Sequence, residues 1–379
     1  MQKESVVMQH EVDSGFSVEM LPPSIPPNSE YPESIMEKSS DDSNKTPGGC
    51  TASTNRSSLV KRHDYRDKNL RDNHIFIVQR LYIRECLTKP LTYHDEDPPV
   101  EARKLLEWID VQPKEIPSEI NHQYEKALGR MQQNGAAESD VAAWFRDAVF
   151  PKDPVQDLLR VQYDITFHRE VVPSRNTPNR VAAPIPDIAI GYRVEGGAFT
   201  EGQRLAGQQI SPTLGQANGL NLHFPFLTVE FKAHVHVNGD LWWEATNQCA
   251  GASASCVEII DRLNAELRKR SEYADSGCTN SIATVAFSYS IDQSNAHLYI
   301  TWKTEDCKYY MRRAKFYCLD KKEEFAMFRR DMRMIIEWGE HHRFKEIQAA
   351  LDFTLDADRK KNMESVKKRE PPSEKRVDR

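Results

Sequence analysis

The sequence predicts a mixed α/β fold in which helices flank a central sheet. Helical patterns come first and three strand-like runs follow. A helix of almost thirty residues then leads to three further strand-like runs and a last helical stretch. This order favours one mixed domain over two repeats. The six expected strands cover residues 165–172, 185–192, 226–237, 282–290, 297–303 and 309–318.

The helices are expected where apolar residues recur every three or four positions. In residues 138–149, Val141, Trp144 and Phe145 follow this spacing and predict an amphipathic helix. The dipeptide Asn134-Gly135 ends the helix before it. A stretch rich in Gly, Gln and Ser at residues 195–220 is too polar for a core and is expected to be a loop. The other expected helices cover residues 65–85, 100–111, 117–133, 240 to about 270, and 320–351.

Charge and composition divide the chain into four parts. Residues 1–62 are expected to be a disordered acidic tail rich in Ser and Pro, because such a segment cannot bury enough apolar surface. Residues 63–116 are expected to be a helical N-terminal extension, and residues 117–355 the folded α/β domain. Residues 356–379 read as a disordered basic tail. Its short basic clusters, at 359–361 and 367–369, suit either a nuclear address or a solvated tail.

Composition excludes several classes of protein. No apolar run approaches the roughly 20 residues that span a bilayer, and the first residues lack the apolar core of a signal peptide. The seven cysteines include no Cys-x-x-Cys pair, which argues against a disulfide scaffold and a zinc ribbon. We therefore expect an intracellular protein without a membrane partner. Phosphate-binding and dinucleotide-binding glycine motifs are absent from the sequence as well.

Charged residues interrupt two of the apolar strands. Pro186-Asp187 lies on the second expected strand, and Glu230-Phe231-Lys232 lies on the third. Strand side chains alternate between faces, so Glu230 and Lys232 share one face. Charges on a mostly buried sheet must be paired or must hold a metal. Two carboxylates suit Mg²⁺, and a nearby lysine can act on the attacking water or on phosphate charge.

This pattern and the order of elements resemble the PD-(D/E)XK nuclease superfamily, and most closely the stand-alone fungal PD-(D/E)XK nuclease-like proteins. The resemblance covers residues 117–351 and rests on Asp187, on the Glu-x-Lys of residues 230–232, and on the stretches 225–232 and 245–251. It implies a restriction-endonuclease-like core, with a mixed central sheet flanked by helices.

The resemblance also implies roles for individual residues. Asp187 and Glu230 would hold Mg²⁺, for which Mn²⁺ can substitute, and Lys232 would be the catalytic lysine. Related nucleases often add a Glu from the first core helix and a Gln from the helix after the Glu-x-Lys strand. Glu138, or else Asp140, and Gln248 occupy those places.

Simpler interpretations exist for each of these residues. Glu230 and Lys232 can form an ion pair at the solvent end of a strand, with Asp187 closing a turn. His234-x-His236 suits half of a zinc site or a phosphate-contacting surface pair. Trp242-Trp243 suits base stacking or core packing. The segment 308–345 holds eleven Lys/Arg against six Asp/Glu, which suits either a phosphate-binding path or a solvated helix face.

Two functions follow from the sequence. The first is a Mg²⁺-dependent nuclease that hydrolyses phosphodiester bonds in nucleic acid, with DNA as the expected substrate. The alternative is a catalytically silent nuclease-fold module that binds nucleic acid or protein. The intact Asp and Glu-x-Lys set favours the first.

Overall fold

The computed structural model describes residues 59–78, 97–111, 122–150, 158–195, 198–233, 240–271 and 281–367. Within these ranges the strands form one seven-stranded mixed sheet in the order β1-β7-β6-β5-β4-β3-β2. The α/β class expected from the sequence is therefore confirmed. The strands are β1 (Ile75–Val78), β2 (Leu159–Gln162), β3 (Ile188–Tyr192), β4 (His223–Phe231), β5 (Val285–Ile291), β6 (Asn295–Lys303) and β7 (Tyr309–Cys318).

The topology is consistent with a restriction-endonuclease-like core. Strands β2, β3 and β4 form an antiparallel meander. The long helix α6 (Asp240–Arg270) lies between β4 and β5 in the chain, and these two strands pair in parallel. Strands β5, β6 and β7 are antiparallel, and β1 adds to β7 in parallel.

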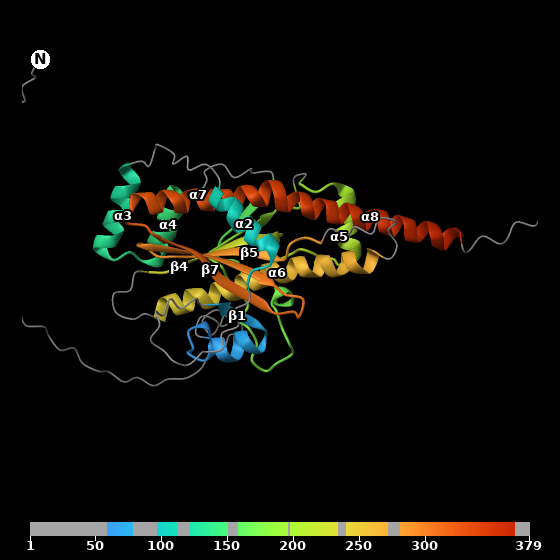
Figure 1. Cartoon of the computed structure of the whole chain (residues 1–379), viewed down its shortest axis with the longest axis horizontal. Helices are drawn as coiled ribbons and strands as arrows, with labels where there is room; N and C mark the ends of the chain where they lie inside the picture. The colour runs from blue at the N-terminus through green and yellow to red at the C-terminus, as the bar shows by residue number, and fades with distance from the viewer. Residues whose placement is uncertain are drawn as a thin grey trace, which may run out of the picture. The chain divides into compact units, whose positions relative to one another are not determined.

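Helices cover both faces of the sheet (Figure 1). Helix α6 packs against β4, β5 and β6 on one face. The other face is covered by α4 (Glu138–Ala148) and α7 (Lys322–Trp338). A π-helical turn (Gly339–Arg343) follows α7 and leads into α8 (Phe344–Lys367), which packs against α6. Aromatic contacts hold this second layer in place, with the rings of Phe145 and Phe231 5.2 Å apart and those of Tyr289 and Phe328 5.4 Å apart. The remaining helices are α2 (Val100–Val111), α3 (His122–Asn134) and α5 (Glu201–Ile210). No helix in the described ranges is both long enough and apolar enough to cross a membrane.

The N-terminal extension differs from its expected helical form. A π-helical turn at Arg66–Leu70 is followed by strand β1, whose sequence Ile-Phe-Ile-Val has strong β propensity. Pairing with β7 supplies the backbone hydrogen bonds of this short apolar strand, and the spacing of apolar residues in the sequence does not indicate that partner. Helix α2 is confirmed at the expected residues, while residues 79–96 and 112–121 lie outside the described part.

The first strand of the meander was also predicted wrongly. It covers Leu159–Gln162, and residues 165–172 instead contain a short 3₁₀ turn at Arg169–Val171. Asp164 has a positive φ of 55°, which turns the chain away from the sheet directly after β2. The second strand ends at the expected residue 192 but begins at Ile188 instead of residue 185. The third begins at His223, three residues early, and ends at Phe231 rather than at the expected residue 237.

The polar stretch 195–220 contains helix α5 rather than loop alone. Thr200 and Gln203 form a reciprocal capping box at its start. Gln203 is buried and donates a hydrogen bond to Asp352 of α8 at 3.0 Å. A polar sequence can therefore form a packed helix here because its buried amide is paired.

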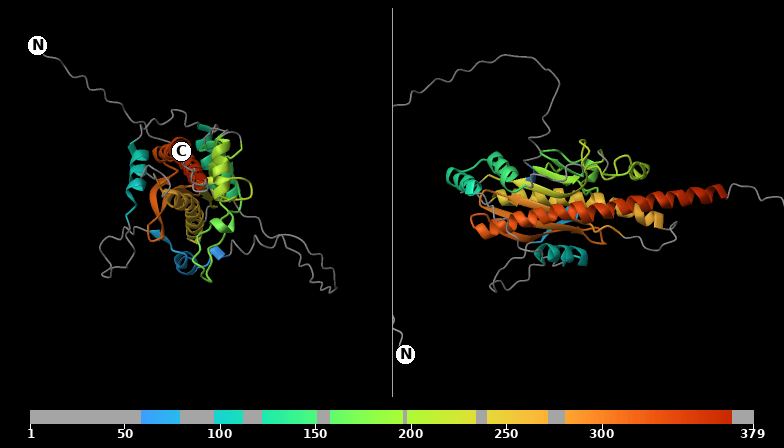
Figure 2. Two further views of the ribbon diagram at one scale, coloured as in Figure 1. Left: turned by 90° about the vertical axis from the view of Figure 1, so that its right-hand side faces the viewer. Right: turned by 90° about the horizontal axis from the view of Figure 1, so that it is seen from above.

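Helix α8 continues beyond the expected start of the basic tail at residue 356 and ends at Lys367 (Figure 2). Ala357 is buried, and Asp358 forms an ion pair with Arg270 of α6 at 3.2 Å. These contacts extend the packed helix, and the basic residues that follow are good helix formers. The tails at 1–58 and 368–379 lie outside the described residues.

Candidate functional site

Asp187 and Glu230 meet because of the register between β3 and β4. Ile188 pairs with Val229, so the next position in this antiparallel register places Asp187 opposite Glu230 on the same face. The Asp187 carboxylate also accepts a hydrogen bond from the backbone N–H of Phe231. The acids are 43 residues apart in sequence, yet the sheet joins them.

Burial gives both carboxyl groups unusual protonation behaviour. Glu230 is 1% exposed, and burial, followed by the nearby Asp187 charge, raises its pKa well above the ordinary value. Burial likewise raises the pKa of Asp187 to about 6, although the hydrogen bond from Phe231 acts in the opposite direction. Two buried acids without a full complement of positive charge favour a bound proton or a bound cation.

Lys232 supplies positive charge beside the two acids. Its N–H donates to the carbonyl of Ile291 at 2.9 Å, which extends the pairing of β4 with β5. Its side chain is buried, and burial alone would lower its pKa. The carboxylates of Glu230 and Glu138 outweigh that effect, so the pKa is raised overall. Lys232 is therefore an ammonium ion at neutral pH.

Glu138 approaches the site from helix α4. Its Oε2 lies 3.7 Å from Nζ of Lys232, and its side chain is about half exposed. It occupies the first position of the helix, where the helix dipole favours an acid. Asp140 has a different task, since its Oδ2 accepts the N–H of Ala137 at 3.0 Å. The structure thus places Glu138, and not Asp140, against the lysine.

Gln248 comes to the site from α6. Its Oε1 and the Oε2 of Glu230 are both buried without a hydrogen-bond partner. Both residues line a pocket of about 170 Å³. Unpaired buried oxygens are costly unless water or a cation meets them, and carboxylate and amide oxygens are hard ligands that suit Mg²⁺. The donor set therefore fits such an ion, although no group of three or more His, Cys, Asp or Glu side chains in the described ranges is arranged to hold a metal.

The N-terminal segment contributes an unexpected wall to this pocket. Val60 and Tyr65 line it, and the Tyr65 hydroxyl accepts the N–H of Ala182 at 3.0 Å. Asn247 of α6 donates to the carbonyl of Val60 at 2.9 Å and accepts from Arg66 at 2.6 Å. No motif in the sequence indicates these contacts, because they join residues between 117 and 187 positions apart.

Glu244 is a second residue that sequence reasoning missed. It is buried on α6, and its Oε2 lies 3.6 Å from Nζ of Lys61. Its charge adds to the rise in the pKa of Glu230. The sequence could have indicated Glu244, because it precedes Gln248 by four residues and therefore lies on the same side of the helix.

Other sequence candidates have different outcomes. His234 and His236 lie outside the described residues. Cys249 and Cys256 are buried free thiols, and burial raises the pKa of Cys249. In the tryptophan pair, Trp243 lies beneath the guanidinium of Arg66, which is 3.4 Å from the ring centroid.

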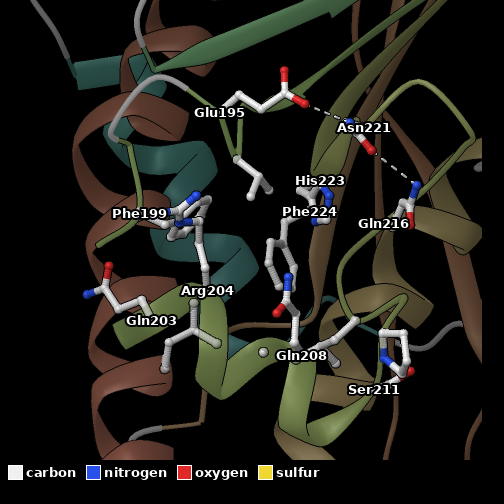
Figure 3. A pocket seen from close by; sticks show the side chains of 15 residues that line it. Glu195, Phe199, Gln203, Arg204, Gln208, Ser211, Gln216, Asn221, His223 and Phe224 are labelled. Atoms are coloured by element: carbon white, nitrogen blue, oxygen red, sulfur yellow. Dashed lines mark hydrogen bonds between the residues drawn. The ribbon is translucent and has the colours of Figure 1, made fainter. Parts of the chain in front are cut away.

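A second pocket, of about 240 Å³, lies at the other end of β4 (Figure 3). It is lined by α5 residues such as Arg204 and by the strand residues His223 and Phe224. Burial lowers the pKa of His223 to about 4, so this imidazole is neutral at pH 7. Seven residues of extended strand, roughly 23 Å, separate His223 from Glu230, so the two pockets are distinct.

The fold and the site together define a mixed α/β protein with two buried carboxylates and a lysine at the end of its sheet. The chain belongs to the family described as Domain of unknown function (DUF7924), whose model matches residues 135–351, more than half of the chain. No curated protein and no solved structure matches the chain significantly. All five candidate residues lie inside the matched range, whereas Val60, Tyr65 and strand β1 precede it.

Proposed function

We propose that the protein is a Mg²⁺-dependent nuclease of the PD-(D/E)XK type that hydrolyses phosphodiester bonds in DNA. The observation that carries this proposal is the meeting of Asp187, Glu230 and Lys232 at the end of β4, beside a pocket with unpaired buried oxygens. An ion pair at a solvent-exposed strand end would not bury both charges of the Glu-x-Lys motif.

Asp187 and Glu230 would hold the Mg²⁺ ion, and Mn²⁺ would substitute for it. The bound ion would lower the pKa of a water molecule and stabilise negative charge on phosphate. Gln248 would offer its amide oxygen to the same hydration shell. Burial of the two acids strengthens their attraction for a cation, because little water screens them.

Lys232 would stabilise the charge that develops on the phosphate. Its raised pKa makes it a cation rather than a base, so electrostatic stabilisation is the role that suits it best. Glu138 would act as a positioning residue, because its carboxylate holds the ammonium group from the open side of the site.

A second candidate is a catalytically silent module that binds nucleic acid or protein. The raised pKa of Glu230 favours it, because a buried acid that keeps its proton needs no metal. Under this alternative the two acids would remain protonated or ion-paired and metal would have no effect.

The location belongs to the proposal too. A nuclease acting on DNA would work inside the cell, and the basic residues 359–361 on the exposed end of α8 suit a nuclear address. Imaging a tagged full-length protein, with and without these three charges, tests that address.

The deciding experiment incubates the purified full chain with circular DNA, linear DNA and RNA, with Mg²⁺, Mn²⁺ or EDTA. The nuclease proposal expects metal-dependent cleavage that is lost in Glu230→Gln and Lys232→Ala. Glu138→Gln should weaken cleavage, because Glu138 positions Lys232. Asp140→Asn is its matched control, because Asp140 caps the same helix without facing Lys232. Binding without cleavage under every metal condition would favour the silent module.

A further inference from the structure

A row of side chains crosses the sheet from the candidate site on β4 to β7. Glu230 of β4 pairs with Ser290 of β5, Ser290 with His297 of β6, and His297 with Phe316 of β7. Paired residues share a face, so the row lies on the face covered by α6. With strands about 4.8 Å apart, His297 lies roughly 10 Å and Phe316 roughly 14 Å from Glu230 along the row.

Aromatic rings gather at the end of this row. Trp242, in the first turn of α6, stacks on His297 with centroids 4.2 Å apart and an angle of 12° between the planes. Phe316 meets the same imidazole edge-on at 5.0 Å. Phe316 is 50% exposed, so part of its ring is open to solvent at this end of the row.

Hydrogen bonds fix the central ring of this group. His297 Nδ1 and the hydroxyl of Tyr299 are 3.2 Å apart, and Ser290 donates to that hydroxyl at 3.4 Å. Burial, with the nearby charge of Arg313, lowers the pKa of His297 to about 4, so the ring is neutral at pH 7. The neutral His297 ring is therefore held in a fixed position between Trp242, which stacks on it, and Phe316, which meets it edge-on.

Positive charge lies next to the stack. Arg313 is exposed and pairs with Tyr299 in the sheet, on the same face as the rings. Proteins bind single-stranded nucleic acid with aromatic rings and nearby cations. The bases stack on the rings, and the phosphate backbone binds the cations.

We propose that Trp242, His297 and Phe316 form a stacking platform for unpaired bases of the nucleic acid whose backbone reaches the Asp187–Glu230–Lys232 site. This inference rests on the proposed function for the identity of the substrate. At the 3.4 Å rise of stacked nucleotides, the platform lies about three to four nucleotides from the cleaved phosphate. The preferred substrate is therefore a single strand, or a duplex with a frayed or single-stranded end.

Fluorescence anisotropy in EDTA tests the platform without cleavage. The probes are a labelled single-stranded DNA and a duplex of the same length. Phe316→Leu keeps an apolar side chain and removes the aromatic face, and we expect it to weaken single-strand binding about tenfold while leaving duplex binding unchanged. Phe316→Trp should restore the affinity, and Trp242→Ala should reproduce the loss.

The matched control is Leu205→Ala, an exposed apolar residue on α5 that lies away from this row. It should bind both probes as the wild type does, and thermal melts should confirm that each variant is folded. Wild-type affinity in folded Phe316→Leu would overturn the platform, because a ring that serves packing alone tolerates leucine.

The platform and the proposed cleavage can fail separately. Single-strand binding that depends on Phe316, without cleavage in Mg²⁺ or Mn²⁺, would retain the platform and reject the nuclease. Metal-dependent cleavage of single strands with unchanged kinetics in Phe316→Leu and Trp242→Ala would retain the nuclease and reject the platform.

Discussion

The two faces of the same strands are chemically opposite. Toward α4 and α7, β4 and β5 present Val229, Phe231, Phe287 and Tyr289, and the aromatic rings of the helices pack onto them. Toward α6, the same strands present four polar residues that are each at most 1% exposed, namely Thr228, Glu230, Ser288 and Ser290, beside the small apolar Ala286. One face of the sheet thus stabilises the fold through hydrophobic packing. The other face buries polar groups and contributes less hydrophobic stabilisation.

The polar face is only partly satisfied by hydrogen bonds. Ser253 of α6 has a hydroxyl partner in Thr301 at 2.7 Å, yet Thr228 Oγ1 and Glu230 Oε2 have no hydrogen-bond partner. Unpaired buried polar atoms are rare in folded proteins, and a bound ion, a water molecule or a catalytic role can account for them. Residues that stabilise the fold and residues of the candidate site therefore lie on opposite faces of the same strands, separated by the two-residue period of the strand.

The largest expected effect tests the polar face. Glu230→Gln should reduce metal-dependent cleavage by about a thousandfold or more, because a neutral amide is a poor substitute for a carboxylate in holding Mg²⁺. Single-turnover cleavage assays measure the loss. The melting temperature without metal should stay the same or rise, since the buried charge is gone; a fall of many degrees would mean that Glu230 serves the fold.

The apolar face should respond in the opposite way. Phe231→Ala should lower the free energy of unfolding by about 3–5 kcal/mol, because it leaves a cavity against Phe145. Thr228→Val is the matched change on the polar face, and it should be neutral or stabilising because the hydroxyl is unpaired. Urea unfolding curves measure the free energy of unfolding of both variants. Equal decreases in the two variants would show that the two faces contribute alike to stability.

Asp187 should make stability depend on pH. Its pKa rises from 3.8 to about 6 on folding, so the folded chain holds the proton more tightly than the unfolded chain does. The carboxyl therefore costs no stability below the unfolded pKa, and the cost grows as pH rises through about 6. Asp187→Asn, which keeps an acceptor for the Phe231 N–H, should gain at most about 3 kcal/mol near pH 7.5 and almost nothing near pH 4.

The comparison of unfolding curves for Asp187→Asn and the wild type across this pH range checks the sign. A gain that is the same at both ends would show that relief of a buried charge is not the cause.

Metal removal should produce a smaller effect that depends on the ligands. At a hundredfold excess of Mn²⁺ over its Kd, the wild type should gain about 2.7 kcal/mol relative to EDTA. The gain should largely disappear in Asp187→Asn and persist in Lys232→Ala, because the lysine does not ligate the ion. Thermal melts measure it, and a wild type without a metal-dependent shift would contradict the proposed site.

The sequence indicates the candidate residues that lie in or directly beside strands β3 and β4. Asp187 and the Glu-x-Lys motif were recognisable because charges break an apolar alternation. Strand β1 and the pocket wall at Val60 and Tyr65 were not recognisable, since long-range contacts alone define them. Helix α5 was missed for a related reason: its buried Gln203 is stabilised by Asp352, 149 residues further along the chain.

Because of strand β1, the segment that forms the sheet is longer than the segment that the family model matches. The family match begins at residue 135, but the sheet ends at Ile75–Val78, where the rings of Phe76 and Tyr310 stack with centroids 5.3 Å apart. A fragment cut at residue 135 would leave the backbone of Tyr309–Arg312 as an open edge, and open edges recruit strands from other molecules. Such a fragment would be prone to aggregate, even though it retains every candidate site residue.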